Sequence, residues 1–81
     1  MAIPISLREI FRFSGFTDHY LIHYWVEGEE YLDSHHPTLE EAGKRFEYLK
    51  DHWQEVFPDG FTAVELVDQY FDQINQFNPF N

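Results

Sequence analysis

The chain has 81 residues and a mass of 9.8 kDa, which fits one small domain. It has a formal net charge of -10, yet 43% of its residues are hydrophobic and 20% aromatic, and such a composition argues against disorder. The absence of cysteine excludes disulfides, thiolate metal sites and a cysteine nucleophile. The negative charge disfavours direct binding to nucleic acid and to anionic membranes.

The sequence suggests one compact domain without a membrane anchor. No stretch approaches the roughly 18 apolar residues needed to cross a membrane. Residues 1–7 lack the basic start and the apolar core of a secretory signal, so we expect a cytoplasmic protein. We expect a compact α+β domain over residues 1–76 and a flexible tail over residues 77–81, where Asn, Gln and Pro79 discourage a continued helix.

Residues 7–14 fit two structures. The pattern Ser6-Leu7-Arg8-Glu9 is typical of a helix start, and Ile5 and Ile10 can pack across it. The alternation in Phe11-Arg12-Phe13 instead fits a strand, which would add a third strand to a sheet. The helix is the preferred prediction.

Residues 20–34 predict a β-hairpin. β-branched and aromatic residues alternate along residues 19–26, as in a strand. Glu27-Gly28 is the predicted turn, after which the chain returns. A two-residue turn would pair Trp25 with Glu30, and a bulged turn would pair Trp25 with Leu32. We favour the bulged turn because it places apolar side chains opposite each other.

An amphipathic helix is predicted over residues 38–56. Thr38-Leu39-Glu40-Glu41 follows Pro37 and can satisfy the free backbone donors of a helix start. The apolar residues behind it recur at steps of three and four, which places them on one stripe. These residues are Leu39, Ala42, Phe46, Leu49, Trp53 and Val56.

A second amphipathic helix is predicted from Thr62 onward. Thr62-Ala63-Val64-Glu65 follows the breaker Pro58-Asp59-Gly60, and apolar residues recur with helical spacing to Ile74. A strand over Phe61–Val67 is the alternative. The predicted fold class is therefore α+β, with an antiparallel hairpin or three-stranded sheet packed against two amphipathic helices. On the second helix, one outer stripe would carry Glu65, Asp68 and Asp72.

Neither a metal site nor catalysis is predicted. The histidines and nearby Asp33 match no metal-ligand spacing, so we expect no metal and no cofactor. Ser34 stands beside Asp33 and His35, but a catalytic triad is a spatial arrangement that sequence neighbours rarely form. No glycine-rich phosphate loop is present, and we expect a protein that is not an enzyme.

Aromatic residues in excess of the core predict a protein interface. Trp25, Tyr31 and Tyr48 remain for the outside and are interleaved with glutamates. Exposed aromatic rings among charges are typical of binding hot spots. The predicted partner-binding residues are Trp25, Glu27, Glu29, Glu30, Tyr31, Tyr48, Glu65, Asp68 and Asp72.

These features favour a small acidic inhibitor that occupies a basic surface of a partner protein. In size, charge and lack of cysteine the chain is similar to phage proteins that imitate DNA to block nucleases or, as anti-CRISPR proteins, CRISPR complexes. The similarity implies a protein partner with a basic groove. One alternative is a regulator of a host metabolic enzyme. Another is a structural subunit or homodimer, formed through the spare face of the sheet.

Overall fold

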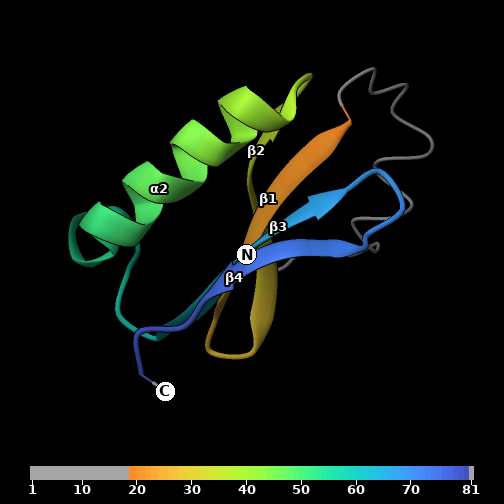
Figure 1. Ribbon diagram of the computed structural model, residues 1–81. Helices are drawn as coiled ribbons and strands as arrows, with labels where there is room; N and C mark the ends of the chain where they lie inside the picture. Colours follow the sequence, from red (N-terminus) through yellow and green to blue (C-terminus); the bar gives the residue numbers. More distant parts are fainter. Residues whose placement is uncertain (1–18, 81) are drawn as a thin grey trace.

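The computed structural model describes residues 19–80, which form a four-stranded antiparallel sheet and one helix (Figure 1). This confirms the α+β class. The elements in chain order are β1 (Tyr20–Val26), β2 (Glu29–His36), α2 (Leu39–Val56), β3 (Phe61–Asp68) and β4 (Gln73–Phe77). The strand order is β2-β1-β3-β4, so α2 carries the chain from β2 past β1 to β3. The choice between helix and strand at residues 7–14 lies outside the described residues.

α2 confirms the helix predicted over residues 38–56. The Thr38 side chain accepts a hydrogen bond from the Glu41 backbone N–H at 3.2 Å, as the capping pattern predicts. The middle of the predicted stripe is buried, whereas Leu39 and Val56 at its ends are exposed. The helix thus packs on the sheet through Ala42, Phe46 and Leu49.

α2 is kinked at His52. This residue has φ -128° and ψ 18°, outside the helical range. Its Nδ1 lies 2.9 Å from the Tyr48 carbonyl oxygen, which can only accept, so the ring donates. A side chain that bonds to a backbone carbonyl within a helix is a recognised cause of a kink. The kink separates the last turn, which includes Trp53, from the straight part of the helix.

The β1–β2 turn confirms Glu27-Gly28, but the bulged register was wrong. Glu27 and Gly28 have φ 52° and 83°, the pair of positive values of a two-residue type I′ turn. This turn pairs Trp25 with Glu30. The preference for an apolar pairing across the hairpin failed because the turn backbone fixes the register. Trp25 instead finds its apolar neighbour on the other side, opposite Ala63 of β3.

The second amphipathic helix was wrong, and the strand alternative holds. Phe61–Asp68 is β3, which lies between β1 and β4. A central strand with apolar groups on both faces lacks a clean period of two, and its apolar run can match helical spacing by coincidence. The buried residues of β3 include adjacent pairs, which explains the error: Phe61, Ala63, Val64, Leu66 and Val67.

Regular structure continues beyond Ile74, where the helical spacing in the sequence ended. Gln73–Phe77 forms β4, so a residue assigned to the tail belongs to the sheet. Beyond the strand, the Phe80 ring lies 5.4 Å from the Trp53 ring at an interplanar angle of 77°. The flexibility of residues 77–81 and the boundary at residue 76 remain predictions.

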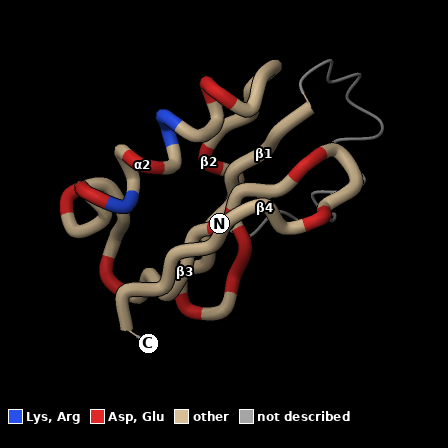
Figure 2. Tube along the Cα trace, in the orientation of Figure 1, with Lys and Arg blue, Asp and Glu red and all other residues tan. Residues whose placement is uncertain are grey.

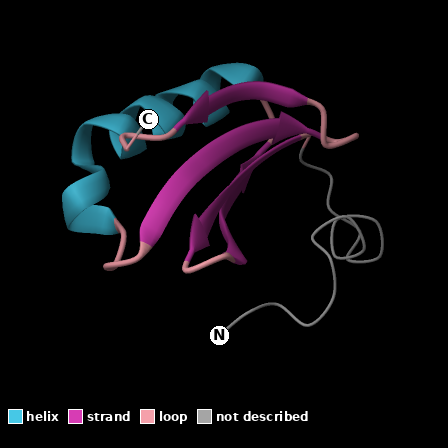
Figure 3. Cartoon of the chain, turned by 90° about the horizontal axis from the view of Figure 1, so that it is seen from below, coloured by secondary structure: helices cyan, strands magenta, loops and turns pink. Residues whose placement is uncertain are grey.

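The two faces of the sheet differ in what covers them. α2 lies along one face of the curved sheet (Figure 3). The main core forms there and includes Ile22, Phe46 and Val64. On the opposite face a smaller cluster forms around Leu21 and Val67. Within the described residues, α2 lacks the long apolar stretch that crossing a membrane requires.

Candidate functional site

The Lys and Arg residues of the described part all lie on α2 (Figure 2). They are Lys44, Arg45 and Lys50. Arg45 is paired with Asp33, and Lys50 Nζ lies 3.5 Å from Glu47 Oε2. Within residues 19–80, the strands and turns therefore carry carboxylates without any Lys or Arg.

Asp33 joins β2 to α2. Its carboxylate, only 8% exposed, accepts bonds from Arg45 Nη2 at 2.9 Å and Nε at 3.0 Å. This bidentate bond raises the pKa of Arg45. Ser34 Oγ also donates to Asp33, at 2.8 Å, so the 2.8 Å contact with His36 Nε2 has the histidine as donor. The hydroxyl proton points to a carboxylate rather than to a basic nitrogen, which argues against a nucleophilic Ser34.

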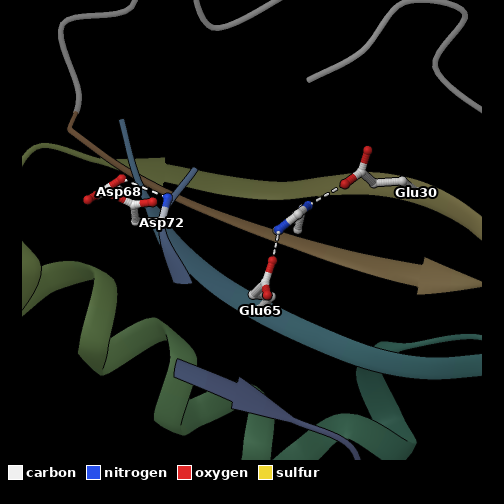
Figure 4. A network of polar contacts seen from close by, with 5 residues as sticks. Glu30, Glu65, Asp68 and Asp72 are labelled. Carbon is white, nitrogen blue, oxygen red and sulfur yellow. Dashed lines mark hydrogen bonds and ion pairs between the residues drawn. The ribbon is translucent and has the colours of Figure 1, made fainter. Parts of the chain in front are cut away.

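His23 of β1 lies between Glu30 and Glu65, the two glutamates labelled in Figure 4. Because side chains alternate along a strand, it points to the sheet face opposite Ile22 and α2. Its Nδ1 is 2.6 Å from Glu30 Oε2, and its Nε2 is 2.7 Å from Glu65 Oε1. The histidine is 3% exposed. Each of these two short contacts needs a proton between its nitrogen and oxygen, so both are hydrogen bonds only if the three side chains share one proton more than a neutral imidazole and two carboxylates hold. Two predicted partner-binding residues thus hold a buried histidine.

Asp68 and Asp72 shape the β3–β4 turn (Figure 4). Asp68 Oδ1 accepts from the backbone N–H of Tyr70 at 2.8 Å and of Asp72 at 3.0 Å. The Asp68 N–H donates to the Asp72 carbonyl at 3.1 Å. The helical stripe predicted for Glu65, Asp68 and Asp72 is therefore wrong, because the first two make internal bonds and lie on a strand.

The three predicted aromatic anchors lie in separate places. The Trp25 ring packs on His23 at 4.6 Å, on the face away from α2. The Tyr31 ring stacks on the Tyr24 ring at 5.5 Å between centroids, and the Tyr24 ring contacts Phe57 in the core on the α2 side. Tyr48 is 46% exposed on α2 itself. Alternation along the strands puts these rings on different faces, so they do not form one patch.

Two tyrosines near the hairpin are electrostatically perturbed. The Tyr31 hydroxyl donates to Glu29 Oε2 at 2.9 Å, and this bond to an anion is the main cause that raises the pKa of Tyr31. Burial, followed by the charge of Asp33, raises the pKa of Tyr24. Both phenols therefore stay protonated to a higher pH than an ordinary tyrosine does.

Sequence patterns did not predict the pocket that lies where α2 ends. It has a volume of about 340 Å³ and is rich in aromatic side chains. The apolar spacing around Pro58-Asp59-Gly60 suggested a helix start, and the position of Phe80 depends on the course of β4. No local signal could bring these segments together. The pocket is lined by Trp53, Gln54, Phe57, Pro58, Asp59, Gly60, Phe61 and Phe80.

The hairpin turn packs against this pocket. The Glu27 N–H donates to the Gly60 carbonyl at 2.9 Å. Gly60 has φ 95°, and a Cβ built there would lie 2.6 Å from Cγ of Glu27. We call the surface formed by Glu27, Glu29, Tyr31 and Asp59 the hairpin end.

In the described part of the chain, no group of three or more His, Asp or Glu side chains has an arrangement that could hold a metal ion. His19 Nδ1 lies 2.7 Å from Gln69 Oε1, and His36 contacts Ser34. Comparison of the chain with protein-family models, curated proteins and solved structures finds no match. A proposal for the function therefore rests on the residues and the geometry of this chain alone.

Proposed function

We propose that the protein is a small acidic inhibitor, without enzymatic activity, that occupies a basic surface of a partner protein in the cytoplasm. The observation that carries this proposal is the confinement of Lys and Arg to α2 in residues 19–80. Carboxylates on the sheet and its turns can take the place that nucleic-acid phosphates hold in a basic groove. Such a surface attracts its partner over long range and makes association sensitive to salt.

The hairpin end is the proposed contact surface. Glu27 and Glu29 are exposed, and the bond from Tyr31 orients the Glu29 carboxylate. The turn is anchored to Gly60, so these charges stand on a fixed backbone. Preorganised charges lose less conformational entropy on binding than mobile ones. Glu30 and Glu65 hold the strands behind this surface through His23, whereas Asp68 orders the β3–β4 turn at the other end of the sheet.

Capture of the tagged protein from host lysate at low salt tests the proposal. We expect a basic protein that is eluted by duplex DNA and by salt, and whose purified activity the acidic protein inhibits. A captured metabolic enzyme that DNA does not displace would instead support the regulator alternative. Absence of any inhibition of the captured protein would contradict the proposal.

A matched pair of variants locates the contact. Glu27→Asn with Glu29→Gln removes two charges, and Asn-Gly is a favoured sequence for this turn, so the hairpin should survive. The control, Glu40→Gln with Glu47→Gln, removes the same charge from α2. We expect the first variant to bind the partner more weakly than the control. Equal losses would contradict a contact through the hairpin end.

A homodimer is the second candidate, favoured by the uncharged edge of the sheet. β4 is the last strand in the sheet order, and its residues 73–76 are exposed and carry no charge. Exposed edge strands without charges can pair with a second copy. Sedimentation at twice 9.8 kDa, reversed by Ile74→Lys, would support this candidate. A monomer at all concentrations would contradict it.

A further inference from the structure

We infer that the aromatic pocket at the end of α2 binds the guanidinium group of an arginine side chain on the partner protein, an inference that rests on the proposed function. The pocket adjoins the hairpin end through Asp59 and through the contact of Glu27 with Gly60. It supplies the aromatic contact that Trp25, Tyr31 and Tyr48 do not supply as a group. The inference depends on its walls, its charge and its size.

The floor of the pocket is built from two core residues, Phe57 and Phe61. The rings of Phe57 and Phe61 stack at 4.4 Å with an interplanar angle of 7°. They are 8% and 4% exposed, so each belongs to the core as well as to the pocket. Side chains fixed by core packing offer a surface that needs no rearrangement when a ligand arrives.

The walls meet at a corner. The centroids of the Trp53 and Phe61 rings lie 5.7 Å apart, with an interplanar angle of 29°. The Phe80 ring is nearly perpendicular to the Trp53 ring. Phe80 is 63% exposed, so much of its ring is open to solvent. The faces of aromatic rings carry partial negative charge and attract cations. A group in this corner can contact two aromatic side chains at once.

Among the residues that the structure describes, the charged side chains at the pocket are all acidic. Asp59 lines it, and Glu27 lies against the lining residue Gly60. α2 ends here at Val56 without a basic residue in its last turn. The carboxyl end of a helix carries partial negative charge, which that turn leaves without a compensating cation. The site therefore favours a cation over a neutral apolar group.

Arginine fits this combination best. Its planar guanidinium stacks on aromatic rings and donates to carboxylates in a fixed geometry, whereas the lysine ammonium is compact and more strongly hydrated. The volume of about 340 Å³ is at the small end of ligand sites and suits one side chain. Asp59 at the pocket can accept from the guanidinium while Trp53 or Phe80 contacts its face.

A titration followed by NMR tests the inference with three short peptides that differ only in a central arginine, lysine or citrulline. Citrulline keeps the planar shape and removes the charge. We expect the arginine peptide to shift the Trp53 indole N–H resonance, with binding about threefold or more tighter than that of the lysine peptide. Citrulline binding as tight as arginine binding would overturn the inference.

Variants distinguish the pocket from general attraction between charges. We expect Phe80→Ala and Asp59→Asn each to weaken binding of the arginine peptide about threefold or more. Tyr70→Ala is the control, since Tyr70 is 72% exposed in the β3–β4 turn outside the pocket. The amide spectra report whether each variant keeps its fold. Binding unchanged in both pocket variants would overturn the pocket while leaving the proposed function intact.

The reverse outcome is also distinguishable. If the pocket binds the arginine peptide but no partner is inhibited, the pocket stands and the proposed function fails. If the partner is inhibited equally by the wild type and by both pocket variants, the proposed function stands and the role of the pocket in it is overturned.

Discussion

His23 Nε2 is hydrogen-bonded to Glu65 Oε1 at 2.7 Å, and this bond joins the two central strands β1 and β3 on the face away from α2. Glu30 holds the other ring nitrogen from β2. A polar side chain in so enclosed a place requires hydrogen-bond partners, because a buried polar group without them is costly. The trio thus links three neighbouring strands.

The first prediction concerns this buried pair. His23→Leu should lower the free energy of unfolding by about 3 kcal/mol, because it leaves the poorly exposed Glu65 without its partner. Adding Glu65→Leu should restore most of that loss, since apolar residues often replace a buried ion pair at little cost. Urea denaturation measures both. A His23→Leu protein as stable as the wild type would contradict the assigned pairing.

The second prediction concerns the link between β2 and α2. Arg45→Lys should lower the free energy of unfolding by about 1 kcal/mol, because an ammonium cannot make both bonds to Asp33. Lys44→Gln, on the same helix, is the control and should change stability less. Thermal unfolding compares the two. A larger loss in the control would show that helix charge matters more than the bidentate bond.

The third prediction concerns glycine. Gly60→Ala should destabilise the protein by about 1–3 kcal/mol, since φ is 95° and the added Cβ would lie 2.6 Å from Glu27 Cγ. Gly43→Ala should stabilise it by up to about 1 kcal/mol, because Gly43 lies within α2 with nothing within 4 Å of an added Cβ. Chemical denaturation gives both signs. Equal effects would contradict the turn geometry.

The fourth prediction concerns alkaline pH. The folded state raises the pKa of Tyr24 above its ordinary value of 10.0, mainly through burial. The neutral phenol is therefore favoured in the folded protein. Its contribution to stability is full below about pH 10, and it is lost as pH rises through the higher folded value. Stability measured against pH should fall in that range, and less so in Tyr24→Phe. An equal fall in both proteins would contradict the assignment.

Local signals in the sequence predicted the elements that depend on local chemistry. The capping residue Thr38 and the stripe through Phe46 marked α2, and Glu27-Gly28 marked the hairpin turn. The prediction of the hairpin register failed because the turn backbone, with positive φ at both Glu27 and Gly28, fixes the pairing more strongly than one apolar cross-strand contact does. The prediction of a helix in place of β3 failed because burial on both faces of the sheet removes the alternation of apolar and polar residues that identifies a strand.

The candidate site was less predictable because tertiary structure assembles it. Acidic residues count equally in composition, yet Glu65 holds a histidine while Glu27 is exposed. The pocket unites a kinked helix end, a loop and the residues after β4, and only the strand order places Phe80 beside Trp53. The composition predicts the sign of the surface charge, but not which aromatic rings adjoin that surface.

The affinity for the captured partner, measured by calorimetry over a series of salt concentrations, tests the central claim most directly. If carboxylates of this protein occupy a basic surface, the affinity should fall steadily as salt rises, and less steeply for Glu27→Asn with Glu29→Gln. An affinity that does not change with salt would contradict the claim.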